Sequence, residues 1–405
     1  MNCKPTAVHA WLASVTRAMH IASQGDAMHD KTTEPTDRFA AWPPGPARLL
    51  IAALAALLVL AAFVPIVAGK MEKPLVGFVD ALTKSKTVAA AARPRDDDLA
   101  LYDRVIARIA HGENYYIVAA EEHRAAHYPL RPGVAVRLPT LAYLEMWLGD
   151  RGEGDARVVP GEAAAAVLLL AAVMWAWWSR LGAEPGGTRY RMTASALIFM
   201  GASLGLNRYH FVLHELWAGM LIALSLGLHR PGRKWLGAVL AAGLALAIRE
   251  HALPYVMLMA ATALWRREWK EGAAWLALIA GFFVYLGIHL HLVAQQVRPD
   301  DVIGPNWLVV RGLSGWLSCV VLSSNLRFLP HFVAGPLVML SLLGWAGWKS
   351  PLGSTATLLF LGYGLLFMLA GRADNYYWGA VIAPVMLGGL AFMPRAVKSL
   401  VAAAR

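Results

Sequence analysis

Residues 49–68 read LLIAALAALLVLAAFVPIVA and contain no charged side chain. As a helix rising 1.5 Å per residue, this run reaches roughly 30 Å, the thickness of a bilayer's hydrocarbon core. Arg48 precedes the run, and basic residues are enriched on the cytoplasmic side of a membrane. The stretch therefore predicts a first transmembrane helix, within residues 47–68, that leads from the cytoplasm to the outer side.

The composition of the whole chain supports this assignment. Of 405 residues, 58% are hydrophobic and only 16% are charged, whereas about a quarter are charged in a soluble domain. The net charge of +11 is interpreted as basic cytoplasmic loops, because no basic stripe interleaved with aromatic residues indicates nucleic-acid binding. We expect an all-α polytopic membrane protein with no nucleic-acid partner.

The apolar segments predict about ten or eleven membrane helices. We expect a cytoplasmic tail (1–46), a first outer loop (69–137), a remaining helix bundle (138–393) with outer loops at 295–315 and 371–379, and a cytoplasmic tail (394–405). Met28 is an alternative start, in which case residues 1–27 would not belong to the protein. Whether the short segment 138–149 crosses the membrane stays open, because its twelve residues are too few for an upright span.

One apolar stretch is predicted to fold back on itself. Basic loops at 229–234 and 266–270 flank it, and flanks on the same side require a hairpin whose arms are each roughly 21 Å long. Arg249, Glu250 and His251 then lie at a recessed tip. Neighbours in a helix point apart, so Arg249 and Glu250 should each need another partner, or Arg249 should face a lipid phosphate.

The outer loop contains the sequence RDDDLALY, with Asp96, Asp97 and Asp98 side by side. Apolar residues follow at helical spacing, which predicts an amphipathic helix suited to the membrane surface. Asp98 is either simply the N-cap of this helix or a general base held above the bilayer. The Asp-x-Asp pattern also leaves open a divalent cation, Mg²⁺ or Mn²⁺.

Further candidates for binding are aromatic, basic and acidic side chains of outer loops and helix ends. Such groups suit a sugar ring or a phosphate, although Tyr and Arg also anchor proteins at the membrane interface. For Asp374, capping of the last helix is as good an interpretation as a binding role. We assign no metal ligands, since His210 and His214 lack further ligands. The candidates are Arg137, Tyr115, Tyr116, His127, Tyr128, Arg208, His214, Asp374 and Tyr377.

The order of these pieces resembles the GT-C superfamily of polytopic membrane glycosyltransferases. The matching strings are RDDDLALY, the exit of the first outer loop ending RLPTLAYL, LALAIREHALPY at 244–255, and GRADNYYW at 371–378. The likeness is one of layout over residues 47–393, and it implies a GT-C-like bundle whose large first outer, periplasmic loop carries amphipathic surface helices.

The resemblance also implies a function. It implies transfer of a sugar from a polyprenyl-phosphate donor to a glycan, lipid or protein acceptor, on the outer face of a bacterial inner membrane. Asp98 would be the base, with Asp97 next and Asp96 assisting, and the configuration at the sugar would invert. Arg249 and Arg137 would hold the departing lipid phosphate, because developing negative charge needs positive charge beside it.

Three alternatives stay open. An O-antigen ligase or polymerase also acts on polyprenyl-linked sugars, but its large outer loop comes late in the chain. A flippase or transporter of lipid-linked sugars would favour paired broken helices, and only one hairpin is found here. The chain could also be a non-catalytic partner in envelope assembly, and loss of all activity on substitution of Asp97 and Asp98 would argue against that alternative.

Overall fold

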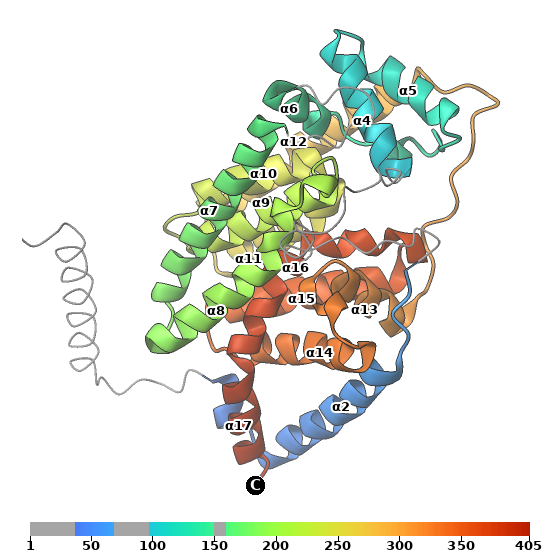
Figure 1. Cartoon of the computed structure of the whole chain (residues 1–405). Coiled ribbons are helices and arrows are strands. Elements are labelled where there is room, and N and C mark those ends of the chain that lie inside the picture. The colour runs from blue at the N-terminus through green and yellow to red at the C-terminus, as the bar shows by residue number, and fades with distance from the viewer. Residues whose placement is uncertain (1–36, 69–96, 150–158) are drawn as a thin grey trace, which may run out of the picture.

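The computed structural model describes residues 37–68, 97–149 and 159–405. These residues form helices joined by short connections, and the only β-type pairing among them consists of isolated bridges (Figure 1). The predicted all-α class is therefore confirmed. Asp96 lies outside the described residues, and so does the part of the first outer loop that precedes it, residues 69–95.

Four helices are long and apolar enough to cross a membrane. They are α2 (Pro44–Phe63), α7 (Pro160–Gly182), α12 (Trp269–Ala294) and α15 (Pro351–Leu369). The segments Ala383–Ala391 and Met393–Ala403, bent by 52°, give a fifth span if they are counted together. The described residues thus contain four or five candidate spans by length and composition, fewer than the ten or eleven expected.

The difference arises because several apolar runs form helices of only 10–17 residues. Such helices are shorter than the ~20 residues that an upright span needs. They are α9 (His214–Leu228), α10 (Leu236–Ile248), α13 (Gly312–Leu322) and α14 (His331–Gly347). The sequence therefore identified α9 and α14 as apolar helices but overestimated their length. Helix α10 has nearly the length expected for an arm of the hairpin, whereas α13, which begins inside the expected outer loop 295–315, was missed.

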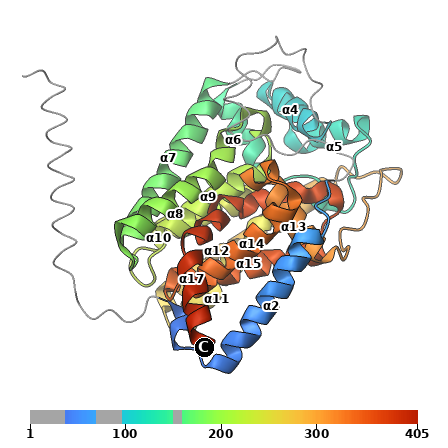
Figure 2. The same cartoon turned by 60° about the horizontal axis from the view of Figure 1, so that its bottom comes forward.

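One end of the bundle, which we call the terminal end, gathers the start of α2, the turn from α7 to α8 (Gly187–Ala202), the turn from α14 to α15, and α17 (Met393–Ala403) (Figures 1 and 2). Trp348 Nε1 donates to Glu184 Oε2 at 3.0 Å, and Arg48 Nε donates to the carbonyl of Ala404 at 2.8 Å. The basic loop 180–191 thus lies beside both ends of the described chain.

The short helix α6 (Thr140–Leu148) lies at the opposite end. Its nine residues reach only about 14 Å, and its last residue, Leu148, lies against Gly161 at the start of α7. Helix α7 then leads to the terminal end. With nine residues, α6 is not among the helices that are long enough to span a membrane.

Helices α4 (Asp97–Ala110), α5 (Tyr115–Ala125) and α6 form a cap over this opposite end (Figure 1). Four residues of the predicted apolar face of α4 are at most 5% exposed, and α4 packs against α5 and α6. The amphipathic face of α4 was expected to lie on the membrane surface, and this expectation is wrong. An apolar face with helical spacing can be buried against protein as well as against lipid. The four buried residues of this face are Leu99, Val105, Ile106 and Ile109.

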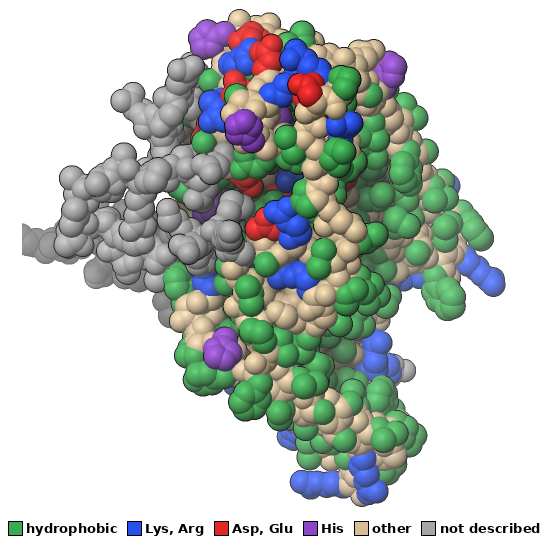
Figure 3. Space-filling view, turned by 90° about the vertical axis from the view of Figure 1, so that its right-hand side faces the viewer, with side chains coloured by type: hydrophobic (Ala, Val, Ile, Leu, Met, Phe, Trp, Pro, Cys, Tyr) green, Lys and Arg blue, Asp and Glu red, His purple; other side chains and the backbone are tan. Residues whose placement is uncertain are grey.

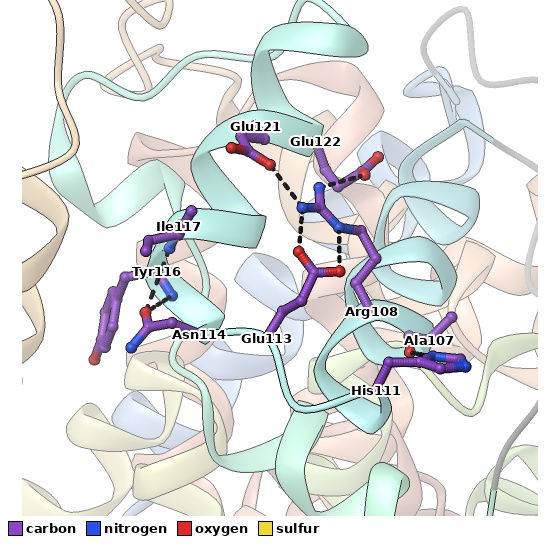
Figure 4. A network of polar contacts seen from close by, with 9 residues as sticks. All are labelled: Ala107, Arg108, His111, Glu113, Asn114, Tyr116, Ile117, Glu121 and Glu122. Carbon is purple, nitrogen blue, oxygen red and sulfur yellow. Dashed lines mark hydrogen bonds and ion pairs between the residues drawn. The ribbon is translucent and has the colours of Figure 1, made fainter.

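Charged side chains hold α4 and α5 together on the outside of the cap (Figures 3 and 4). Arg108 donates to Glu113 at 2.5 Å, to Glu121 at 2.6 Å and to Glu122 at 3.1 Å. The hydrogen bond from Arg108 lowers the pKa of Glu113. Exposed pairs each contribute less than about 1 kcal/mol, so this network orients the two helices more than it stabilises the fold.

The predicted hairpin exists as a break between two short helices. Helix α10 ends at Ile248, the 3-10 turn η7 (Glu250–Ala252) follows, and α11 (Leu253–Trp265) begins with Pro254 in its first turn. Each helix has 13 residues, or about 20 Å. The loops before α10 and after α11 both lie within electrostatic reach of Arg180 in α7. Their placement at one end agrees with the expected fold-back.

The chain between α12 and α13, residues 295–311, connects the cap to the rest of the bundle. Near its start, Arg124 of α5 pairs with Asp301 at 2.7 Å, and the amide of Gly304 donates to the carbonyl of Arg131 at 2.6 Å. Near its end, the amide of Gly371 donates to the carbonyl of Trp307 at 2.8 Å. The hydrogen bonds of Arg124 hold the pKa of Asp301 at about 2.

Candidate functional site

Asp98 lies in the first turn of α4 and faces the interior of the cap. The helix begins at Asp97, so the interpretation of Asp98 as the N-cap residue is wrong. Its half-buried carboxylate accepts a hydrogen bond from the Tyr128 hydroxyl. Burial raises the pKa of Asp98, although Tyr128 and Arg137 oppose the shift. A carboxylate with a raised pKa is a stronger base than a solvated one.

Arg137 lies behind Asp98, at the exit of the first outer loop. Its Nε donates to the Tyr102 hydroxyl at 3.0 Å, and its carbonyl accepts from the Tyr115 hydroxyl at 2.7 Å. The Tyr102 ring meets the ring of His214 edge-on at 5.2 Å. These side chains line a cavity of about 20 Å³, enough for about one water molecule. Among the described residues, no carboxylate forms an ion pair with Arg137.

Arg249 is 1% exposed and binds two carboxylates. Its Nη2 lies 2.8 Å from Glu215 Oε1, and its Nη1 lies 2.5 Å from Glu250 Oε1. The expectation that Arg249 and Glu250 cannot pair is wrong because the helix has ended: Arg249 is extended, with φ −147°. Adjacent residues outside a helix can turn toward one another, and Glu215, also 1% exposed, completes the buried site.

The tip of the hairpin also contacts the last part of the chain. The rings of His251 and Trp378 lie 4.4 Å apart, and the carbonyl of His251 accepts from the Tyr363 hydroxyl at 2.5 Å. Trp378 belongs to η9 (Ala373–Val381). In the same turn, Asp374 accepts two hydrogen bonds from Arg372. The side chain that bonds the backbone amide at the start of η9 is that of Asn375, whereas Asp374 was the expected cap.

Electrostatic coupling joins these groups into one polar cluster. Asp98 interacts with Arg137, Asp374 and Glu215, and Arg137 interacts with Tyr102, Tyr377, Glu215 and Glu250. The structure thus brings together residues from the cap, α9, η7 and η9. We define the polar cluster as Asp98, Tyr102, Tyr128, Arg137, His214, Glu215, Arg249, Glu250, His251, Asp374 and Tyr377.

Other candidates lie outside the polar cluster or cannot be placed. Tyr116 points toward α12, where its hydroxyl lies 3.4 Å from His289 Nδ1. His127 is exposed, with a positive φ of 56°. Tyr115 lies at the edge of the cluster, where its hydroxyl bonds the Arg137 carbonyl and its side chain lines the same cavity as Tyr102. The side chains of Asp97 and Arg208 lie outside the described part of the structure, although Asp97 opens α4 and Arg208 opens η6 (Arg208–His210).

Within the described ranges, no group of three or more His, Cys, Asp or Glu side chains could hold a metal ion. The pair formed by Asp96 and Asp98 falls partly outside these ranges. Divalent-cation binding there therefore stays a prediction of the sequence.

Two members of the polar cluster were missed as site residues. Tyr102 has the helical spacing of the apolar face of α4, yet it follows Asp98 by four residues and so lies on the same side of the helix. Glu215 follows His214 at the start of α9. An acid in the first turn of an otherwise apolar helix is the signal that could have indicated its role, because buried charges need partners.

No protein-family model, no curated protein and no solved structure matches this chain. The resemblance to GT-C glycosyltransferases therefore stays a prediction from the layout of the sequence. What the molecule can do is inferred from the polar cluster itself.

Proposed function

We propose that this protein is an integral-membrane glycosyltransferase of the GT-C type. It would transfer a sugar from a polyprenyl-phosphate donor to a glycan, lipid or protein acceptor in the cell envelope. The observation that supports this proposal is the convergence of Asp98, whose pKa is raised, with the guanidinium of Arg137 in the polar cluster. A base beside fixed positive charge is what transfer from a lipid phosphate requires.

In the proposed reaction, Asp98 accepts the proton of an acceptor hydroxyl. The hydroxyl oxygen forms a bond to the anomeric carbon while the bond from that carbon to the phosphate oxygen breaks. The phosphate leaves with the electron pair, still attached to its lipid, and attack from the opposite side inverts the configuration. The hydroxyl of Tyr128 fixes the orientation of the carboxylate through its hydrogen bond to Asp98.

The two arginines would have different roles. Arg249 is already neutralised by Glu215 and Glu250, so its main effect is to position the tip of the hairpin. Arg137 bonds a phenol rather than a carboxylate, which leaves its charge available for the departing phosphate. A divalent cation, Mg²⁺ or Mn²⁺, is a further candidate for this charge, and chelation by EDTA tests it.

The distribution of charge supports an outward-facing reaction. The basic loops that hold Arg230 and Arg266 lie at the terminal end, and basic loops are retained in the cytoplasm. The polar cluster lies at the other end, so we propose that it faces the periplasm of a bacterial inner membrane.

The test is sugar transfer in proteoliposomes supplied with radiolabelled polyprenyl-phosphate sugars. Asp98→Asn should lower turnover by about 10²–10⁴-fold, as expected for loss of a general base. Glu121→Gln removes an acid on the exposed side of the cap and should keep wild-type turnover. Full turnover by a folded Asp98→Asn protein would refute the assigned base.

A second candidate is a transporter that flips lipid-linked sugars. The break between α10 and α11, with charged side chains at its tip, is a feature of transporters. The same vesicles distinguish the two: a flippase moves the labelled lipid between leaflets without forming a new glycosidic bond.

A further inference from the structure

A second and larger cavity opens at the terminal end, away from the polar cluster. Its volume is about 830 Å³, and its walls come from η2 (Arg38–Ala41), α8 (Gly187–Ala202), η10 (Leu387–Ala391) and α17. Sites for small molecules and cofactors commonly have volumes of ~300–1,000 Å³. The proposed transfer reaction assigns no role to this cavity.

Three cations line the cavity. Arg189 comes from the first turn of α8, and Arg395 and Lys398 come from α17, where a spacing of three residues places them on one face. None of the three makes a hydrogen bond or ion pair with any residue that the structure describes. Like charges that converge without a counter-charge favour binding of an anion.

The acid in the described lining does not neutralise these cations. Asp37 is 5% exposed, and its Oδ1 accepts the amide of Phe39 at 2.9 Å, so it serves as the cap of η2. Three cations and this one acid leave a formal charge of +2 on the described lining, from 3 − 1. An occupant that carries negative charge is therefore favoured.

The remaining wall of the cavity is apolar and firmly packed. Leu390, Ala391 and Pro394 face it, and the Tyr190 ring, which also lines it, stacks on Phe392 with an interplanar angle of 15°. Phe392 in turn stacks on Trp348 at 4.3 Å. A wall of this kind suits the glycerol and upper acyl region of a lipid better than a fully hydrated ion.

We propose that this cavity binds the phosphate headgroup of an anionic phospholipid from the leaflet at the terminal end. Arg189, Arg395 and Lys398 hold the phosphate, and the apolar wall contacts the first carbons of the acyl chains. Basic pockets between membrane helices are suited to such headgroups. The inference does not depend on the glycosyltransferase proposal, because it uses residues at the opposite end of the molecule.

The experiment measures lipid binding to the purified, detergent-solubilised full-length protein by native mass spectrometry. Phosphatidylglycerol and phosphatidylcholine with identical acyl chains are titrated in parallel, and glycerol 1-phosphate is added as a soluble competitor. The variant Arg189→Gln/Arg395→Gln/Lys398→Gln removes the three cations. The control Arg233→Gln/Lys234→Gln/Lys270→Gln removes three exposed cations, two from the loop before α10 and one from the start of α12, so the two proteins have equal net charge.

Wild type should bind phosphatidylglycerol at least about tenfold more tightly than phosphatidylcholine, as expected for several basic residues near a headgroup. The cavity variant should lose this preference, and the control should keep it. Equal binding of the two lipids, or an equal loss in both variants, would overturn the proposal. Displacement of the lipid by glycerol 1-phosphate at comparable concentration would assign the cavity to a soluble phosphate and overturn the lipid assignment. If the cavity variant fails to fold, Lys398→Gln alone is compared with Lys270→Gln, and an unchanged lipid preference would count against the site.

Discussion

Replacing Arg249 by methionine should strongly destabilise the protein, because it leaves a buried carboxylate without its cation. Arg249 and Glu215 are each 1% exposed, and their side chains lie 2.8 Å apart. Methionine keeps much of the volume of arginine but none of its charge. Glu215 would then have to stay charged in a dry environment or take up a proton, and either outcome costs free energy.

The size of the effect follows from the partners that remain. Removing one member of a buried ion pair costs about 3–5 kcal/mol, and Arg249→Met should fall in this range. Glu215→Gln should cost less, because Arg249 keeps Glu250 at 2.5 Å. The double variant Glu215→Gln/Arg249→Met should recover part of the loss of Arg249→Met, since the buried charge of Glu215 is then removed together with its cation and only the more exposed Glu250 loses its partner.

The assay is reversible unfolding of the detergent-solubilised protein in a titration with SDS, followed by tryptophan fluorescence. Arg233→Met, in an exposed loop, is the control and should change the free energy of unfolding by less than about 0.5 kcal/mol. Unfolding of Arg249→Met at the wild-type SDS concentration would show that the ion pair does not stabilise the hairpin tip. The same conclusion would follow if the changes in the free energy of unfolding of the two single variants simply add in the double variant.

Three further predictions concern pH, the 295–311 connection and helix packing. As the pH is lowered, sugar transfer should begin to fall at a pH above 3.8, the ordinary pKa of an aspartate, because burial raises the pKa of Asp98 and a protonated carboxyl cannot act as a base. A pH–rate profile checks this prediction. The acidic limb of the profile should vanish in Asp98→Asn. Arg124→Gln should speed hydrogen exchange in residues 295–311 at neutral pH. In wild type the Asp301 carboxylate, with its pKa lowered to about 2, should keep that connection ordered above pH ~4 and lose its effect as the pH falls toward 2; exchange that is unaffected by either change would contradict the role of the pair. Gly379→Ala should destabilise the protein by ~1–3 kcal/mol, because a Cβ at this position would lie 1.9 Å from a backbone carbonyl oxygen of α13. Gly281→Ala is the control in the same unfolding assay and should be tolerated, because a Cβ there would have no neighbouring atom within 4 Å.

Much of the fold could be predicted from the sequence because apolar runs and their basic flanks are strong signals. The helix at the start of the bundle and the hairpin between two basic loops are examples. Helix length was harder to predict, since an apolar residue can be helical or extended with equal hydrophobicity. The face of α4 could not be assigned either, because Leu99 and Ile106 have the same spacing whether lipid or protein covers them.

The site could be predicted in part. The cost of burying charge in an apolar hairpin indicated Arg249, and the acidic triplet and the basic residues of the first outer loop indicated Asp98 and Arg137. Their partners depend on contacts that are distant in sequence, such as the one between Arg249 and Glu215. The pairing of Arg249 with Glu250 was missed because the rule for helical neighbours does not apply where the helix has ended.

The connection between α12 and α13 acts as a short tether that limits how far the cap can open. Gly304 is bonded to Arg131 on the cap side, and Trp307 is bonded to Gly371 beside η9. The three peptide units between these anchors can extend to at most about 11 Å. While both hydrogen bonds hold, the cap and η9 cannot separate further at this point. If the proposed transfer takes place, a bulky acceptor must approach from a side that the tether does not cross, or break one of the anchors as it enters.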